Sequence, residues 1–307
     1  MNLLKDLCAV RGASGDEVEV KKFILEYVER NKKSWKSEPE IIQGKGFQDC
    51  LILVFGKPTT AIYAHMDSIG FTVGYEKELI KIGGPRIIDG TILVGSDSKG
   101  EIECELIVLE DEEGNLKIEY VFDREIERGT NLVFKQKWVE TEEYVQSCYM
   151  DNRLGVWNAL KVCETLENGA IVFSCWEEHG GGSVGYCAKY LLDKYEVYQA
   201  LISDITWVTN GVVHGGGVAI SMRDSGIPRK SYLNKVIDIA FKNNIQYQLE
   251  VESAGGSDGT ALQKSPYPID WLFIGAPEGN VHSPTERVYK NDIDSMVELY
   301  KALMISL

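Results

Sequence analysis

Short apolar runs recur along the chain and predict buried strands. They are CLILVF (50–55), AIYA (61–64), AIVFSCW (170–176), ALIS (200–203) and WLFIGAP (271–277). Bounded apolar runs of this length are typical of strands that are covered on both faces. Stretches with apolar residues at helical spacing alternate with these runs and cover residues 18–28, 154–163, 184–195, 232–243 and the chain after 291. The alternation predicts an α/β fold.

Local signals refine this outline. Ser14-Gly-Asp-Glu17 has the spacing of a capping box, which predicts that Ser14 and Glu17 cap the first long helix. The runs 50–55 and 61–64 flank a Gly-Lys-Pro turn, so we expect these two strands to pair. Further along, the pattern predicts a long loop after residue 203, a strand over 247–251 and a short helix over 259–264.

The middle of the chain has a different character from its two ends. Residues 68–147 are rich in glycine and charge and contain repeated short β-like segments without helices between them. Such a pattern predicts a small β-barrel or sandwich. We therefore predict a discontinuous α/β domain, residues 1–67 and 148–307, with a β-rich domain, residues 68–147, inserted into it.

Charge and composition narrow the class of partner. The formal net charge of −15 would repel phosphate backbones, so no nucleic-acid partner is expected. No apolar run approaches the roughly 20 residues that span a bilayer, and the first residues lack the apolar core of a signal peptide. The seven cysteines are scattered, without a C-x-x-C pair, and are expected to be small buried side chains. We therefore expect a cytoplasmic protein without a membrane partner.

Isolated acids and histidines follow the predicted strands. They are His65 and Asp67 after the run 61–64, Glu177 and Glu178 after 170–176, Asp204 after 200–203, and His282 shortly after 271–277. In open α/β sheets, ligands bind beyond the carboxyl ends of the strands. Carboxylates and imidazoles that meet there suit a divalent metal ion. The sequence therefore predicts a metal site at this edge of the sheet.

The residue types also suggest how such a site would work. His65 can bind a metal while Asp67 accepts the second ring N–H, because residues two apart in a strand point the same way. Of the Glu177–Glu178 pair, one carboxylate can bind a metal and the other can act as general base. Asp151, at the start of a predicted helix, is either an ordinary helix cap or a bridge between two cations. The set matches a two-metal hydrolase, whose ions lie roughly 3.5–4 Å apart.

An ordered series of motifs resembles one known family. The motifs are AHMDSIGF (64–71), CYMDNRLGV (148–156), FSCWEEHGGGSVG (173–185), LISDI (201–205), GGSDGTAL (255–262) and VHSPTERV (281–288). In content and order they resemble the M42 metalloaminopeptidases, which include glutamyl aminopeptidases and the tetrahedral TET peptidases. The resemblance covers nearly the whole chain. It departs from the usual family pattern at Ser68 and Asn152, after the glutamate pair and around Asp258.

The resemblance implies a fold, an activity and a role for each site residue. The fold would be a mixed-sheet, zinc-peptidase-like catalytic domain with an inserted β-barrel. The activity would be removal of N-terminal residues from peptides by a water that bridges two metal ions. Asp151 would bridge both ions, His65 and Asp204 would complete one metal site, and Glu178 and His282 would complete the other. Glu177 would be the general base. Asp67 would orient His65, and Asp258 would support the site or substrate.

The family also implies cofactors and an assembly. The cofactors would be two divalent ions, with zinc expected and cobalt or manganese as alternatives. The subunits would form a homo-oligomer, either a dimer or a dodecamer. The preferred N-terminal residue is left open by the sequence.

Four other functions compete with this interpretation. A metal-dependent amide deacylase and an inactive metal-binding scaffold would use the same ligands. A glycan hydrolase would use the carboxylates alone and would not need His65 or His282. A serine hydrolase is suggested by Gly-Gly-Ser-Val-Gly at 181–185 with His-Gly-Gly-Gly at 214–217, but the oxyanion motif should precede the nucleophile.

Overall fold

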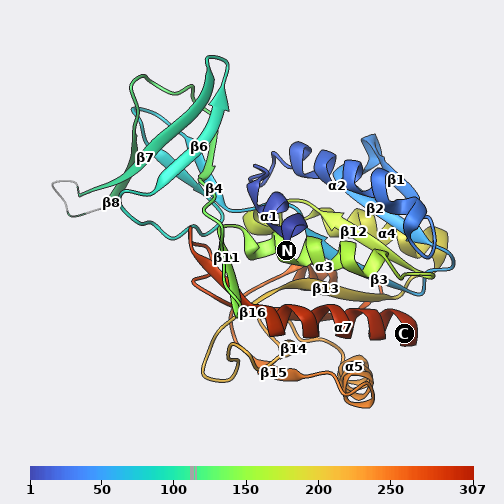
Figure 1. The fold of residues 1–307 in the computed structure, drawn as a ribbon. Helices are drawn as coiled ribbons and strands as arrows, with labels where there is room; N and C mark the ends of the chain where they lie inside the picture. The colour runs from blue at the N-terminus through green and yellow to red at the C-terminus, as the bar shows by residue number, and fades with distance from the viewer. Residues whose placement is uncertain (111–113, 115) are drawn as a thin grey trace.

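The computed structural model describes residues 1–110, 114 and 116–307. It has two sheets, one of eleven strands that helices cover and one of six antiparallel strands (Figure 1). This architecture confirms the predicted fold class, a mixed-sheet α/β unit combined with a small barrel-like β unit.

The helices and strands have the following bounds. The helices are α1 (Asn2–Ala9), α2 (Val18–Asn31), α3 (Met150–Cys163), α4 (Ser183–Tyr195), α5 (Lys230–Lys242), α6 (Asp258–Lys264) and α7 (Lys290–Ser306). The strands of the large sheet are β1 (Glu40–Gly44), β2 (Gln48–Phe55), β3 (Thr60–His65), β10 (Val139–Glu140), β11 (Tyr144–Ser147), β12 (Gly169–Ser174), β13 (Gln199–Trp207), β14 (Val218–Arg223), β15 (Tyr247–Val251), β16 (Asp270–Gly279) and β17 (Glu286–Tyr289). Those of the small sheet are β4 (Gly70–Val73), β5 (Leu79–Ile82), β6 (Ile92–Asp97), β7 (Gly100–Glu110), β8 (Leu116–Val121) and β9 (Asn131–Phe134).

Four parallel strands form the centre of the large sheet, in the order β12-β3-β13-β16. Their register places Ser174 of β12 opposite His65 of β3, and Ile202 of β13 opposite Tyr63 of β3. Asp204 lies two residues beyond Ile202 and is therefore level with His65. Because the strands are parallel, their carboxyl ends meet at one edge, which is where the predicted site residues lie.

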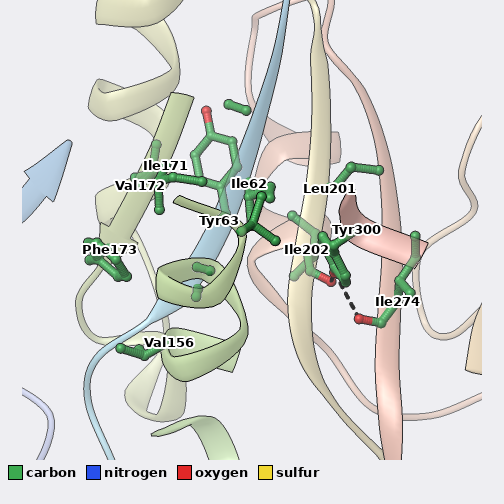
Figure 2. Packing of buried hydrophobic residues seen from close by; sticks show 14 of the residues in the cluster. Ile62, Tyr63, Val156, Ile171, Val172, Phe173, Leu201, Ile202, Ile274 and Tyr300 are labelled. Atoms are coloured by element: carbon green, nitrogen blue, oxygen red, sulfur yellow. Dashed lines mark hydrogen bonds between the residues drawn. The ribbon is translucent and has the colours of Figure 1, made fainter. Parts of the chain in front are cut away.

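The core of the large sheet is covered on both faces, since every residue of β3 and β12 is buried. Helices α3 and α7 pack against each other and against this sheet, as do α4 and α6. Tyr300 of α7 lies beside Ile202 and Ile274 (Figure 2), and its hydroxyl is 2.6 Å and 2.9 Å from their carbonyl oxygens. The α7 helix is thereby tied to β13 and β16, two of the four central strands.

The small sheet stands apart from the large one (Figure 1) and has the strand order β5-β4-β9-β6-β7-β8. An isolated bridge between Glu78 and Glu119 brings its two edges together, so the sheet is nearly closed. It has an apolar core of its own, in which Phe71, Phe134 and Tyr149 pack edge-on or stacked. Strand β11 pairs instead with β17 in the large sheet, and β10 pairs with β11. The division of the chain into domains stays a prediction.

Several local predictions were wrong, and each failed because of a distant partner. Strands β2 and β3 do not pair, because β12 lies between them. The long loop expected after residue 203 contains β14, which pairs with β15 and β16. The run 200–203 continues as a strand to Trp207, so Asp204 lies within β13 and not after it.

The predicted capping box is also absent from the start of α2. The Ser14 hydroxyl donates to Asp67 Oδ2 at 2.6 Å, and Glu17 Oε1 accepts from the backbone N–H groups of Gly15 and Trp176 at 2.9 and 3.1 Å. Ser14 and Glu17 therefore make tertiary contacts near the predicted site, with Asp67 and Trp176, and do not cap the helix.

Two further expectations concern the chain as a whole. All seven cysteines are buried, as the composition predicted. Within the described residues, none of the helices combines the length and apolar character that a bilayer crossing needs.

Candidate metal centre

Six of the predicted site residues come together from five segments of the fold. His65 ends β3, Asp151 lies in the first turn of α3, Asp204 lies in β13, and Glu177 and Glu178 form a short turn after β12. His282 lies in the loop between β16 and β17. These six side chains line one cavity of about 360 Å³. Asp67 and Asp258 lie beside this cavity and are not part of its wall.

Asp151 lies between the two histidines. Its Oδ1 is 3.2 Å from His65 Nε2, and its Oδ2 is 3.2 Å from His282 Nε2. The backbone at Asp151 and Asn152 is not helical, although both lie at the start of α3, and the peptide bond between them is cis. One carboxylate thus presents a separate oxygen to each imidazole.

Each histidine has further carboxylates on its own side. His65 Nε2 is 3.6 Å from Asp204 Oδ2 and 3.8 Å from Glu177 Oε2. His282 Nε2 is 3.2 Å from Glu178 Oε2. Potential ligand atoms of His65, Asp151 and Glu178 lie within 4.8 Å of one another, close enough to share one ion.

Asp67 connects the histidine to the glutamate turn. It is fully buried, with its Oδ1 3.4 Å from His65 Nδ1, and its backbone oxygen is 3.2 Å from the same nitrogen. Its carboxylate accepts hydrogen bonds from the backbone N–H groups of Glu177 and Glu178, both at 3.1 Å. Asp67 therefore fixes the position of the glutamate turn as well as that of the imidazole.

Asp258 is the first residue of α6 and is buried behind the cluster. Its Oδ2 accepts a hydrogen bond from Ser174 Oγ, which lies opposite His65 in the sheet. Burial raises the pKa of Asp258 to about 7. The side chain contacts the strand that leads to Glu177 and does not reach the cavity itself.

The charges of the cluster perturb one another strongly. Burial opposes ionisation of Asp151, but hydrogen bonds with His282 and His65 hold its pKa below the usual range. Burial and the neighbouring Asp151 raise the pKa of Glu178 to about 7, and burial also raises the pKa values of Glu177 and Asp204. Burial lowers the pKa of His65, but Asp204, Asp151 and Asp67 outweigh it and hold this pKa well above its ordinary value.

The cluster fits a divalent cation. Glu178 Oε1 is buried and has no hydrogen-bond partner among the described residues. Among the described residues, the cavity wall next to Asp151 contains four carboxylates and two imidazoles, and the wall contains no lysine or arginine. A buried, uncompensated carboxylate is unfavourable unless a cation neutralises it. Imidazole nitrogen and carboxylate oxygen are the donors found in catalytic zinc sites.

Two buried carboxylates near Asp151 were not predicted. Glu286 Oε2 accepts a hydrogen bond from the Asp151 backbone N–H at 3.3 Å, and both oxygens of the buried Glu278 lack a partner among the described residues. Burial and the charge of Glu286 raise the pKa of Glu278 well above its usual range. Glu278 directly follows the apolar run 271–277, so the same strand-end signal that identified Asp204 would have found it.

The serine hydrolase alternative does not fit the structure. Ser183 is buried, and its hydroxyl exchanges hydrogen bonds with the backbone N–H and C=O of Cys175, both at 2.9 Å. His214 stacks on Tyr289 and does not contact this serine. Ser183 is therefore committed to joining α4 to the end of β12.

The mixed sheet, with carboxylates and histidines gathered at its carboxyl edge, has the architecture of zinc-peptidase-like catalytic domains. The M42 glutamyl aminopeptidase family matches residues 112–299, which is more than half of the chain. The chain belongs to this family of metal-dependent enzymes, and it is an aminopeptidase, a hydrolase of peptide bonds.

Individual relatives match over almost the full length. A protein of Acetivibrio thermocellus that carries an aminopeptidase name is 27% identical over 97% of this chain and 96% of its own length. An aminopeptidase of the archaeon Desulfurococcus kamchatkensis has a TM-score of 0.84 at 23% identity, covering 99% of this chain and 93% of that one. The TET1 peptidase of Pyrococcus horikoshii, which can assemble into a tetrahedron or a large octahedral shell, has a TM-score of 0.81 at 24% identity, covering 100% and 99%. The two structural likenesses show that the fold is shared.

Proposed function

We propose that the chain is a dinuclear metal-dependent aminopeptidase that removes N-terminal residues from peptides, with Glu177 as the general base. The observation that carries this proposal is the position of Asp151. Its two oxygens face two different imidazoles at 3.2 Å each, and each imidazole has its own carboxylate partner. A carboxylate shared between two such half-sites could hold a pair of cations close together.

The half-sites divide the ligands as follows. His65 and Asp204 would hold one ion, His282 and Glu178 would hold the other, and Asp151 would contact both. When bound, two divalent cations would lower the pKa of water and polarise a carbonyl group. Zinc is the ion proposed, with cobalt or manganese as substitutes, because the donors are imidazole and carboxylate.

Glu177 lies beside His65 in the cavity and is not part of the proposed ligand set. Its side chain is 18% exposed, and its Oε2 lies 3.8 Å from His65 Nε2. Asp67 holds its backbone N–H in place. In this position Glu177 would take a proton from the attacking water and pass it to the nitrogen of the leaving peptide. Asp67 would orient His65, and Asp258 would support β12 through Ser174.

The remaining parts of the proposal concern the whole protein. We propose a homo-oligomer, a dimer or a dodecamer, which is supported by the assemblies of the TET1 peptidase. Residues 1–67 and 148–307 would form the catalytic domain, and residues 68–147 the inserted lid or contact domain. The location would be cytoplasmic. Light scattering on the purified protein tests the assembly, and a monomeric mass would contradict it.

Glu177→Gln tests the role of the base. After chelation and reloading with zinc, cobalt or manganese, the variant should bind about two metal ions per chain, as the wild type does. Its turnover of aminoacyl chromogenic substrates should fall by about 100- to 10,000-fold, because proton transfer is lost. Glu298→Gln, the same charge change at an exposed position of α7, is the matched control and should leave both quantities unchanged.

The outcomes separate the competing functions. Unchanged turnover in Glu177→Gln would reject this residue as the base. Metal binding without cleavage of any aminoacyl substrate would favour an inactive scaffold. Cleavage of small amides alone would favour a deacylase.

A further inference from the structure

The cavity that contains the metal centre has a second acidic wall. This wall is formed by Asp224, which follows β14, Glu250 in β15, and Glu252, which follows β15. We call these three residues the distal wall. None of them belongs to the proposed ligand set.

Strand pairing brings the distal wall together. Strands β14 and β15 are parallel, with Ser221 opposite Glu250, and the backbone N–H of Glu252 donates to the carbonyl of Arg223 at 3.0 Å. Thr206 Oγ1 donates to Glu250 Oε1. Because Thr206 lies two residues beyond Asp204 in β13, this contact joins the distal wall to the metal centre.

The protein compensates the charges of the distal wall only in part: burial raises the pKa of Asp224, and the charge of the neighbouring Arg223 opposes that rise. Glu250 is 3% exposed and Asp224 is 8% exposed. Asp224 Oδ1 accepts from the Gly226 N–H at 2.5 Å, and the residue lines the cavity. Among the residues that the structure describes, no lysine or arginine lines this cavity. Buried carboxylates of this kind are costly unless a cation pairs with them.

The three carboxylates also act on one another. Burial raises the pKa of Glu250, and the charges of Glu252 and Asp224 raise it further. A cation placed among the three would relieve this repulsion and gain charge-assisted hydrogen bonds. An anionic side chain in the same place would add to the repulsion.

Aromatic rings complete the distal part of the cavity. Trp207 ends β13 and is 43% exposed, and Phe273 of β16 lies in the same wall. Gly255 lies against the Trp207 ring, where a Cβ would be 3.6 Å from the indole. Long basic side chains pack their aliphatic stems on such surfaces and extend the charged end beyond them. A ring followed by carboxylates therefore matches a lysine or arginine side chain.

We propose that the distal wall selects peptides whose N-terminal residue is lysine or arginine, with Asp224, Glu250 and Glu252 as the specificity-determining residues. The proposal rests on the aminopeptidase function proposed above, since the selected residue is the one that is released. The metal centre would hold the scissile end of that residue, and the distal wall would bind its cationic side chain. An N-terminal glutamate would be disfavoured.

The test compares chromogenic substrates of lysine, arginine, leucine and glutamate on the metal-loaded enzyme. We expect kcat/KM for lysine and arginine to exceed the values for leucine and glutamate by about tenfold or more, as a charged hydrogen bond predicts. Glu252→Gln is the main variant, because Glu252 is the partly exposed member of the distal wall. Asp224→Asn is the second, because an amide oxygen can still accept from Gly226.

Each variant should reduce kcat/KM for the lysine substrate by about tenfold. The value of kcat/KM for the leucine substrate should change by less than about threefold. Glu298→Gln should change neither. Free L-lysine should inhibit the wild type more strongly than L-norleucine, which has a similar stem without the ammonium group. This difference should disappear in Glu252→Gln.

Several results would overturn the proposal. They are a preference for leucine or glutamate, an equal loss of activity on all substrates in the variants, and a loss of bound metal in Glu252→Gln, which would make the distal wall a metal site. Failure to cleave any of the four substrates would instead contradict the aminopeptidase function itself.

Discussion

Asp67 shows how much one side chain can organise. It contacts His65 and the backbone of Glu177 and Glu178, and it receives a hydrogen bond from Ser14. These residues come from three distant parts of the chain. A carboxylate can do this because its two oxygens together offer about four acceptor positions. The geometry of the proposed base and of one histidine therefore depends on a residue that does not line the cavity.

Glu17 gives a prediction at the same scale. Burial raises its pKa from the ordinary 4.5 to about 7. The folded state therefore binds a proton more tightly than the unfolded state, so the free energy of unfolding should fall as pH rises from about 4.5 to about 7. Glu17→Gln keeps the oxygen that accepts from Gly15 and Trp176 and removes this titration. The variant should gain stability relative to the wild type between pH 5 and pH 8.

Chemical unfolding of the metal-loaded proteins at these two pH values measures the effect. Glu19→Gln is the control, since Glu19 is exposed on the same helix. A stability difference between Glu17→Gln and the wild type that is the same at both pH values would contradict the prediction.

At the scale of elements, the close approach of α3 to β13 positions Asp204. Asn152 Nδ2 donates to the Ser203 carbonyl at 2.9 Å, and Ser203 Oγ donates to the Gly155 carbonyl at 3.1 Å. A Cβ at Gly155 would overlap the Ser203 carbonyl and the Asn152 side chain. The helix can lie this close to the strand only because residue 155 has no side chain.

Gly155→Ala should therefore destabilise the protein by about 1–3 kcal/mol and reduce activity, because the added methyl pushes α3 away from β13. Gly185→Ala is the matched control within α4, where a Cβ would meet nothing within 4 Å. It should be neutral or stabilise by up to about 1 kcal/mol through helix propensity. Thermal unfolding of both variants decides the point, and equal melting temperatures would show that the packing at Gly155 tolerates a methyl group.

At the scale of the whole molecule, the candidate metal centre concentrates negative charge that the rest of the chain does not balance. The chain has a net charge of −15, and its carboxylates from α3, β13 and the glutamate turn share one cavity. Mutual repulsion at this position acts against the packing of the central strands. A cation that binds only the folded state should relieve it and stabilise the whole fold.

Removal of divalent metal should therefore lower the melting temperature by about 10 °C, which corresponds to a contribution of a few kcal/mol from tight binding. Calorimetry of the protein before chelation, after chelation and after addition of zinc measures this. A melting temperature that does not change on chelation would contradict a metal centre. Chelator already saturated with metal is the control.

Much of the fold could be predicted from local patterns. The apolar runs at 61–64 and 170–176 and the helical spacing after 291 predicted β3, β12 and α7, because strand and helix periods are properties of neighbouring residues. The failures were of another kind. The pairing of β2 with β12 and the presence of β14 depend on partners that are more than 25 residues away.

The sequence by itself determined which residues could form the centre, because isolated histidines and acids at strand ends are visible without coordinates. Only the tertiary structure decided that Asp151 divides its oxygens between His65 and His282, and that Asp224, Glu250 and Glu252 form the far wall of the same cavity. The physical reason is the distance along the chain between the residues that interact. Periodicity reflects contacts within one element, whereas the approach of two oxygens to two nitrogens depends on how β3, α3 and the loop before β17 pack together.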